Sequence, residues 1–250
     1  MGAGHHHHIY RPGDTVVHRL PPQCKLPAVL GFAVVVVATP REMFAAFAGY
    51  ALILAGVAAA ARVPPWFVLR RMAVELPFVV FALALPVIGL GERVSFAGMS
   101  LSLEGLWAAW NILVKATLGV VASILLAATT EPRMLLLGAQ RLRVPPLLVQ
   151  IAMFMLRYMD VILDEMRRMR IARESRGFTA RDVRHIPVIA RSAGALFIRS
   201  YERGERVHLA MLSRGYGGSM PMISDLSASW RQWMLAGLLP VLALLVLGVL

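Results

Sequence analysis

The chain repeats one short motif at two positions that lie 38 residues apart. The first copy, residues 171–178, reads Ile-Ala-Arg-Glu-Ser-Arg-Gly-Phe, and the second, residues 209–216, reads Leu-Ala-Met-Leu-Ser-Arg-Gly-Tyr. The alignment extends upstream to three further pairs: Asp164 with Glu202, Arg168 with Arg206, and Ala172 with Ala210. The match is therefore longer than a chance tripeptide. Each copy closes a charged amphipathic stretch, and the two equivalent arginines, Arg176 and Arg214, predict two equivalent receptors on partner proteins.

Composition indicates a membrane protein. Hydrophobic residues make up 58% of the chain and charged residues 16%, with a mean hydropathy of +0.66. These values lie outside the usual range for soluble domains, and the apolar runs approach bilayer-spanning length.

The single cysteine, Cys24, excludes a disulfide framework or thiolate metal cluster within one chain and is expected to be inert. The first 25 residues carry no apolar stretch with a cleavage site, so no removable signal peptide is expected.

We expect an all-α membrane protein with about five transmembrane helices and a cytoplasmic domain of long amphipathic helices. The apolar segments lie at about residues 26–39, 43–61, 72–90, 105–129 and 230–250. The first segment is short, because 14 residues reach only about 21 Å of a roughly 30 Å hydrocarbon core. We therefore expect this helix to start earlier, to tilt little or to stop short of crossing the membrane. The predicted organisation is an N-terminal segment 1–25, transmembrane helices 26–130, a cytoplasmic helical region 131–229 and a last transmembrane helix 230–250.

The distribution of positive charge predicts the orientation. Residues 1–25, 62–71 and 131–229 hold 3, 3 and 16 Lys or Arg residues, whereas the loops on the opposite side hold only Arg41 and Arg93. The positive-inside rule therefore places the N-terminus and the long helical region in the cytoplasm. The formal net charge of +12 could also suggest nucleic acid, but the arginines lie beside membrane helices without a recognisable binding fold. Protein and lipid surfaces are the expected partners.

Two helices are predicted in the cytoplasmic region. Val144-Pro145-Pro146 marks the start of the first, since proline is tolerated in the first helical turn and disfavours helix before it; this helix is expected to run to Ser175. The second is expected from about Ile186 toward Leu212. An apolar stripe follows the first helix at steps of three and four residues: Ile151, Met155, Tyr158, Ile162, Met166 and Met169. Both helices would act as rods that carry a Ser-Arg-Gly tip.

The tips have two interpretations. Glycine after the last helical residue permits the left-handed conformation that closes a helix, and arginine there complements the helix dipole, so a single Arg-Gly pair is explained by capping alone. Two copies in one register, each followed by an aromatic residue, favour docking. Arginine offers a planar fork of donors, and small neighbours let a partner approach closely. The candidate site is therefore Ser175, Arg176, Gly177, Ser213, Arg214 and Gly215, flanked by the anchoring aromatics Phe178 and Tyr216.

Motifs for enzymatic chemistry are missing from the sequence. Neither Lys25 nor Lys115 follows a glycine, so the chain has no Walker A phosphate loop for ATP. There is also no His-Glu-x-x-His, no Cys-x-x-Cys and no Gly-x-Ser-x-Gly, which removes the commoner routes to metalloprotease or serine-hydrolase activity. We expect a protein that is not an enzyme and holds no cofactor.

The residues of this region resemble a known family. The run from Arg157 through Glu165, followed by residues 167–178, is similar to the transmembrane T component of energy-coupling factor (ECF) transporters, with the closest likeness to CbiQ of cobalt uptake systems. Residues 18–26 also resemble the family's His-Arg-Leu-Asp-Pro-Arg-x-Lys-Leu entry into the first helix, although Pro21 and Gln23 replace the Asp and Arg. The family's paired tips read Ala-Arg-Gly, and both begin here with serine, a change that should preserve docking.

The resemblance implies a scaffold between membrane and cytoplasmic partners. In the family, the T component joins two cytoplasmic ATPases (CbiO-like) to a substrate-binding membrane subunit (CbiM-like), with a small CbiN-like subunit often present. Each tip arginine inserts into a groove on one ATPase. ATP is bound by the ATPases and the transported Co²⁺ by the substrate-binding subunit. The resemblance thus implies a multi-pass protein of the bacterial inner membrane that transmits ATP-driven motion; nickel systems use a very similar component.

Three further features carry weaker indications. Residues His5 to His8 could gather metal or could be an expression remnant. Lys115 lies within the fourth predicted helix, where a charge often marks function, but a structural pairing is expected, with Glu75 too far away in depth. The methionines at 153, 155, 159, 166 and 169 fit adaptable packing against a moving partner better than metal binding.

Three other functions remain open on the sequence. A conventional ABC importer permease would also lack a phosphate loop, but it works as a pair of chains with one coupling segment each. A secondary transporter would place its repeat and polar sites inside the membrane, whereas the repeat here is cytoplasmic. A membrane enzyme would show turnover in the isolated chain.

Overall fold

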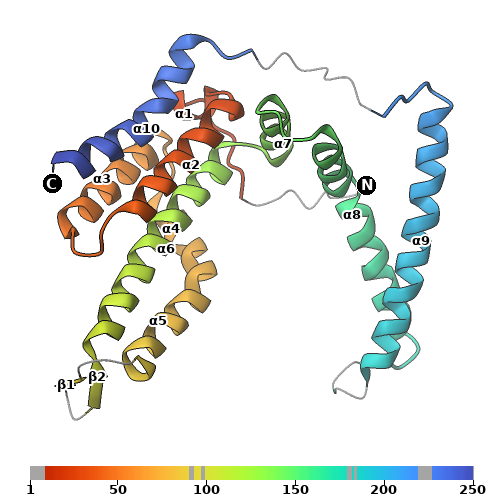
Figure 1. The fold of residues 1–250 in the computed structure, drawn as a ribbon. Helices are drawn as coiled ribbons and strands as arrows, with labels where there is room; N and C mark the ends of the chain where they lie inside the picture. Colours follow the sequence, from red (N-terminus) through yellow and green to blue (C-terminus); the bar gives the residue numbers. More distant parts are fainter. Residues whose placement is uncertain are drawn as a thin grey trace. The chain divides into compact units, whose positions relative to one another are not determined.

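The computed structural model describes residues 9–89, 93–96, 99–178, 182, 185–218 and 227–249, and their fold is that of an all-α membrane protein (Figure 1). His5 to His8 lie outside the described residues. The chain divides into two compact units. One comprises the described part of residues 143–225, and the other comprises residues 9–142 with the described part of 226–250.

The larger unit holds the apolar helices. Its elements in chain order are α1 (Val16–Arg19), α2 (Pro22–Ala38), α3 (Phe44–Ala60), α4 (Pro65–Arg71), the 3₁₀ turn η1 (Met72–Glu75), α5 (Leu76–Ile88), β1 (Arg93–Phe96), β2 (Met99–Ser102), α6 (Leu103–Thr129), α7 (Pro132–Arg141) and α10 (Trp230–Val249). The strands β1 and β2 form a short antiparallel hairpin in which Arg93 pairs with Ser102. This hairpin connects α5 to α6, two helices that pack along one another.

Four described helical stretches are long and apolar enough to cross a membrane: residues 65–88, 103–129, 146–174 and 230–249. Two shorter apolar helices, α2 and α3, have 17 residues each. The multi-pass prediction is confirmed, and the first predicted helix does start earlier, at Pro22. Residues 146–174 belong to the region that the sequence assigns to the cytoplasm. That assignment stays a prediction.

The core of the larger unit lies between α2, α3, α6 and α10. Phe32, Phe47 and Tyr50 are buried there, and the ring of Tyr50 meets the other two edge-on at centroid distances of 5.9 and 6.2 Å. Elsewhere α5 and α6 approach one another so closely that a Cβ atom on Gly105 would lie 2.4 Å from the Leu85 carbonyl oxygen. Only glycine fits at this crossing.

The N-terminal segment is bound to the end of α6. The Arg11 backbone N–H donates to the Ala128 carbonyl at 2.9 Å, and the buried Lys25 ammonium donates to the Thr129 carbonyl at 3.0 Å and to Thr130 Oγ1 at 2.9 Å. A cation is favourable there because carbonyls at a helix C-terminus carry partial negative charge. In the same segment Arg19 forms an ion pair with Asp14, in which two side-chain nitrogens each lie 2.8 Å from a carboxylate oxygen.

Lys115 has a structural partner. Its ammonium donates to the Val37 carbonyl at the end of α2, at 2.8 Å. The buried Glu75 instead accepts a hydrogen bond from the Thr117 hydroxyl. The pairing expected for Lys115 is therefore present, and it is made with backbone rather than with Glu75. Cys24 is a buried free thiol.

Candidate functional site

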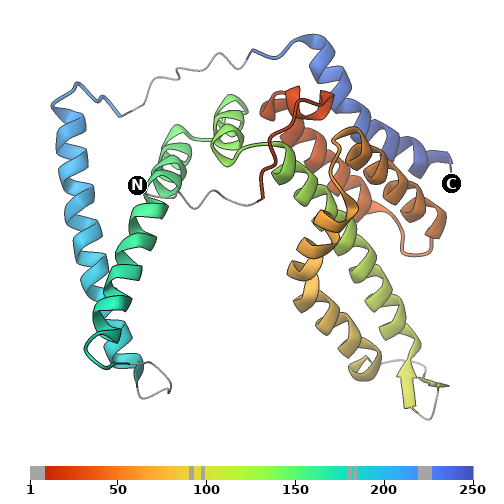
Figure 2. The same ribbon diagram turned by 180° about the vertical axis from the view of Figure 1, so that it is seen from behind.

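The smaller unit consists of two long helices that each end in a copy of the repeated motif. The helix α8 spans Pro146–Glu174 and α9 spans Ile186–Leu212, both within a residue or so of the predicted bounds. They lie side by side in both views (Figures 1 and 2), and Arg199 of α9 forms an ion pair with Glu165 of α8. Proline in the first turn and glycine after the last residue define the start and end of α8, as predicted.

The first tip is closed by a Schellman motif. Gly177 has φ +77°, the Phe178 N–H donates to the Arg173 carbonyl at 3.1 Å, and the Gly177 N–H donates to the Glu174 carbonyl at 3.0 Å. The Ser175 hydroxyl donates to the Ala172 carbonyl at 3.1 Å. These bonds satisfy carbonyls that the end of α8 would leave unpaired.

The second tip repeats this geometry bond for bond. Gly215 has φ +80°, the Tyr216 N–H donates to the Met211 carbonyl at 3.0 Å, and the Gly215 N–H donates to the Leu212 carbonyl at 3.0 Å. The Ser213 hydroxyl donates to the Ala210 carbonyl at 3.0 Å. The sequence repeat is thus a repeat of conformation.

The exposure of the side chains also matches between the tips. The Ser-Arg-Gly residues of both copies are exposed, whereas the aromatic residue that follows, Phe178 or Tyr216, is half-buried. Neither Arg176 nor Arg214 forms an ion pair with another described residue. A Cβ atom on Gly177 or Gly215 would meet nothing within 4 Å, so their role within the chain is the positive φ alone. Helix capping therefore explains the two glycines, and the arginine side chains remain available to contact a partner.

The two aromatic residues are held by different neighbours. The ring of Phe178 meets the His185 ring edge-on at 5.1 Å. The hydroxyl of Tyr216 accepts a hydrogen bond from the Gln150 amide in the first turns of α8. No local sequence pattern signals Gln150, because the bond joins residues 66 positions apart. Only the tertiary pairing of α8 with α9 brings Gln150 to Tyr216.

The Gln150 contact places the two tips at opposite ends of α8. The first tip directly follows Glu174, and the second lies beside Gln150. At 1.5 Å per residue, the 25 residues from Gln150 to Ser175 span about 37 Å. One body of this size therefore presents two like-shaped cationic tips at a fixed spacing.

The predicted apolar stripe of α8 is only partly covered by the described residues of its own unit. Ile151, Met155 and Met166 are exposed, and Tyr158, Ile162 and Met169 are half-buried. The helix α9 has no buried residue. In a two-helix unit this much apolar surface is available for lipid or for another protein.

No group of three or more His, Cys, Asp and Glu side chains that could hold a metal ion occurs among the described residues. The chemistry of the tips is that of hydrogen-bond donors: each guanidinium offers five, in a plane that matches carboxylates and carbonyls. Their geometry suits recognition by a partner surface.

Comparison with known proteins gives a consistent result. The family described as CbiQ, cobalt transport protein, matches residues 13–223. The energy-coupling factor transporter transmembrane protein EcfT of Bacillus selenitireducens is 31% identical over 227 residues, which cover 84% of this chain and 82% of that protein. The cobalt transport protein CbiQ of Rhodobacter capsulatus is 28% identical over 204 residues, 80% of each chain.

A shorter match reaches higher identity. An uncharacterised protein of Methanocaldococcus jannaschii is 34% identical over 110 residues, which cover 44% of this chain and 41% of that protein. The matched family region contains both tips, the helices α8 and α9 and the larger unit up to α7. This chain belongs to the CbiQ family, the transmembrane T components of energy-coupling factor transporters.

Proposed function

We propose that this chain is the coupling subunit of an ECF-type importer for cobalt ions. In this role it would join two cytoplasmic ATPases (CbiO-like) to a separate CbiM-like membrane subunit that binds the Co²⁺, with a CbiN-like small subunit as a further partner. The chain itself would hold neither ATP nor metal and would catalyse no reaction. The observation that carries the proposal is the pair of tips with the same hydrogen bonds, the same exposure and opposite positions along α8.

The tips are proposed to dock into one groove on each ATPase. Arg176 and Arg214 would supply the charged fork, the adjoining Ser175, Gly177, Ser213 and Gly215 would permit close approach, and Phe178 and Tyr216 would anchor the contact. Identical receptors would explain why two segments of one chain adopt one conformation. A spacing of about 37 Å between tips would suit two receptors on different subunits better than one receptor.

Motion would then be transmitted through α8 and α9. When the two ATPases close on ATP and reopen after hydrolysis, helices held at both tips must move with them. A helix is a stiff element, and the Glu165–Arg199 ion pair ties the two rods near their middles. The apolar surface left uncovered on α8 is proposed to contact the substrate-binding membrane subunit, which would tilt between outward and inward states. The family membership supports this arrangement at the level of the transporter class.

The proposal places the protein in the bacterial inner membrane with its N-terminus and the region 131–229 in the cytoplasm, as the distribution of Lys and Arg predicts.

Cobalt is favoured over nickel by the description of the matching family and by the name of the Rhodobacter capsulatus relative. A nickel importer of the same type is the alternative.

The test is the composition and transport activity of the assembled complex. Co-expression with the candidate partners should yield one copy of this chain per two ATPase subunits, and cells that carry the complex should accumulate Co²⁺ only when ATP hydrolysis is intact. Two copies of this chain per two ATPases would instead indicate a conventional ABC permease. Accumulation of Ni²⁺ but not Co²⁺ would identify a nickel importer, and transport without any ATPase would overturn the proposal.

A further inference from the structure

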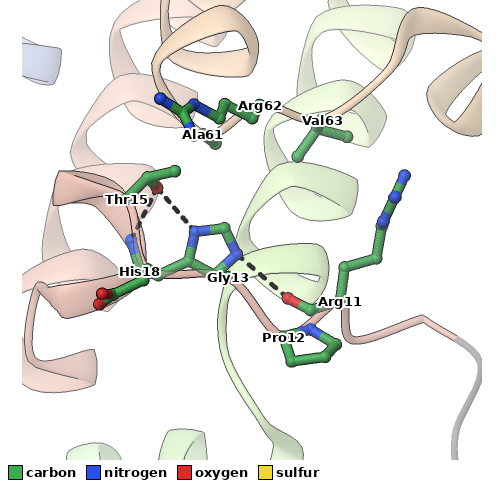
Figure 3. Close-up of a pocket in the computed structure, with 9 residues that line it drawn as sticks. Arg11, Pro12, Gly13, Thr15, His18, Ala61, Arg62 and Val63 are labelled. Carbon is green, nitrogen blue, oxygen red and sulfur yellow. Dashed lines mark hydrogen bonds between the residues drawn. The ribbon is translucent and has the colours of Figure 1, made fainter.

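A cationic pocket lies in the larger unit. It has a volume of about 240 Å³ and is formed between the N-terminal segment and the turn after α3, with Arg11, Thr15, His18 and Arg62 among its lining residues. Figure 3 shows Arg62 and Val63 on one side, Thr15 and His18 on the other, and the Arg11 side chain rising along the edge.

The pocket lies where the apolar helices end. The Arg11 backbone N–H donates to the carbonyl of Ala128, the second-last residue of the candidate span α6, and α3 ends at Ala60, directly before the pocket. Trp66, three residues after Val63 and near the start of α4, is 73% exposed. Tryptophan is enriched at the membrane–water interface, so the exposed Trp66 and the end of a candidate span support a position of the pocket near lipid headgroups.

Arg62 has an unusual backbone conformation. Its φ is +52°, and the bonds around it are those of the two tips: its N–H donates to the Ala59 carbonyl at 3.0 Å, and the Val63 N–H donates to the Ala58 carbonyl at 2.9 Å. Arg62 thus stands where the tips have Gly177 and Gly215. A left-handed φ is unfavourable for a residue with a side chain. Glycine would adopt this φ with less strain, so the backbone of the helix end does not itself require an arginine at position 62.

The other polar groups leave the two guanidiniums available. Asp14 also lines the pocket, but both oxygens of its carboxylate are held at 2.8 Å by Arg19. The two ring nitrogens of His18 bond to the Arg11 carbonyl at 3.1 Å and to Thr15 Oγ1 at 2.7 Å, so His18 shapes the loop. Among the described residues neither Arg11 nor Arg62 has an ion-pair partner, and Arg11 lies over the Phe67 ring at 5.5 Å.

We propose that this pocket binds the phosphate group of an anionic membrane phospholipid, with Arg11 and Arg62 as its ligands. A guanidinium binds phosphate oxygens through paired charged hydrogen bonds. Basic pockets at the ends of membrane helices are suited to such headgroups. The bound lipid would fasten the N-terminal segment to the ends of α3 and α6.

The experiment is thermal unfolding of the purified full chain in a neutral detergent, titrated with phosphatidylglycerol, with phosphatidylcholine or with inorganic phosphate. The variants are Arg62→Gly and Arg11→Gln. The matched control is Arg143→Gly, because Arg143 also has a left-handed φ, +66°, but does not line the pocket.

Phosphatidylglycerol should raise the Tm of the wild type and of Arg143→Gly, whereas either pocket variant should need about tenfold or more lipid for the same rise, from loss of a charge-assisted hydrogen bond. Without lipid, Arg62→Gly should unfold no earlier than the wild type, since glycine relieves the backbone strain. An equal Tm rise with phosphatidylcholine or in the pocket variants would overturn the proposal. An equal rise with inorganic phosphate would assign the site to the free ion, and a lower lipid-free Tm of Arg62→Gly would show that the side chain serves the fold.

Discussion

The Gln150 amide donates a hydrogen bond to the Tyr216 hydroxyl, and this bond fixes the second tip beside the first turns of α8 while the first tip lies beyond its last residue. The bond should decide how firmly the second tip is held. We expect Tyr216→Phe, which removes only the hydroxyl, to loosen the second tip and leave the first unchanged. A net hydrogen bond of about 1 kcal/mol corresponds to about fivefold faster amide hydrogen exchange at residues 213–216. Equal acceleration at residues 175–178, or none at either tip, would contradict this.

The tip glycines should be sensitive to substitution because of their positive φ. Gly177→Ala and Gly215→Ala are each expected to destabilise the local helix end by about 1 kcal/mol, since alanine resists a left-handed φ. The matched control is Gly204→Ala inside α9, where a Cβ also meets nothing within 4 Å. There alanine should stabilise the helix by roughly 0.5–1 kcal/mol. Hydrogen exchange along α8 and α9 measures both effects; destabilisation by all three changes would disprove the conformational explanation.

The buried Lys25 should be a main determinant of stability in the larger unit. Lys25→Met removes the hydrogen bonds to the Thr129 carbonyl and to Thr130 Oγ1 and leaves both acceptors buried. We expect a loss of roughly 2–4 kcal/mol, measured by thermal unfolding in detergent. The control is Arg19→Gln, which breaks an exposed ion pair with Asp14 that water screens, so its loss of stability should be clearly smaller. Equal losses of stability in the two variants would show that the buried hydrogen bonds of Lys25 contribute no more than the exposed ion pair.

The crossing of α5 and α6 should not accept a side chain at Gly105. Gly105→Ala would force a Cβ to within 2.9 Å of Pro86 Cα and closer still to the Leu85 carbonyl, so we expect a loss of roughly 1–3 kcal/mol. Gly119→Ala in the same helix is the control, because its Cβ would meet nothing within 4 Å. Thermal unfolding of the two variants in the same detergent should give a lower Tm for Gly105→Ala than for Gly119→Ala. A stable Gly105→Ala variant would mean that the two helices are more loosely packed.

The sequence predicted the elements whose signals are local. Prolines at 145 and 146 and glycine at 177 set the ends of α8, and the apolar runs located the helices of the larger unit. The sequence repeat is matched by a repeat of conformation, because the two tips form the same backbone hydrogen bonds. Docking of these tips on ATPases stays a prediction.

Features that depend on tertiary contact could not be predicted. The helix α7 was not distinguished from the charged region, although it packs against α2. The contacts of Gln150 with Tyr216 and of Lys115 with the Val37 carbonyl join residues 66 and 78 positions apart, and no local pattern signals them. Arg62 was also missed, because the left-handed conformation there is not accompanied by the glycine that usually marks it.

The central claim is that Arg176 and Arg214 couple this chain to two ATPases. The most direct measurement is co-purification of the ATPase with the wild-type chain and with the double variant Arg176→Glu/Arg214→Glu, with membrane insertion checked in parallel. The control is Arg168→Glu/Arg191→Glu, which reverses two exposed charges on α8 and α9 away from the tips. The account predicts that the ATPase is retained by the wild type and the control and lost from a properly inserted tip variant. Retention by the tip variant at the wild-type level would show that the arginines serve only to cap their helices.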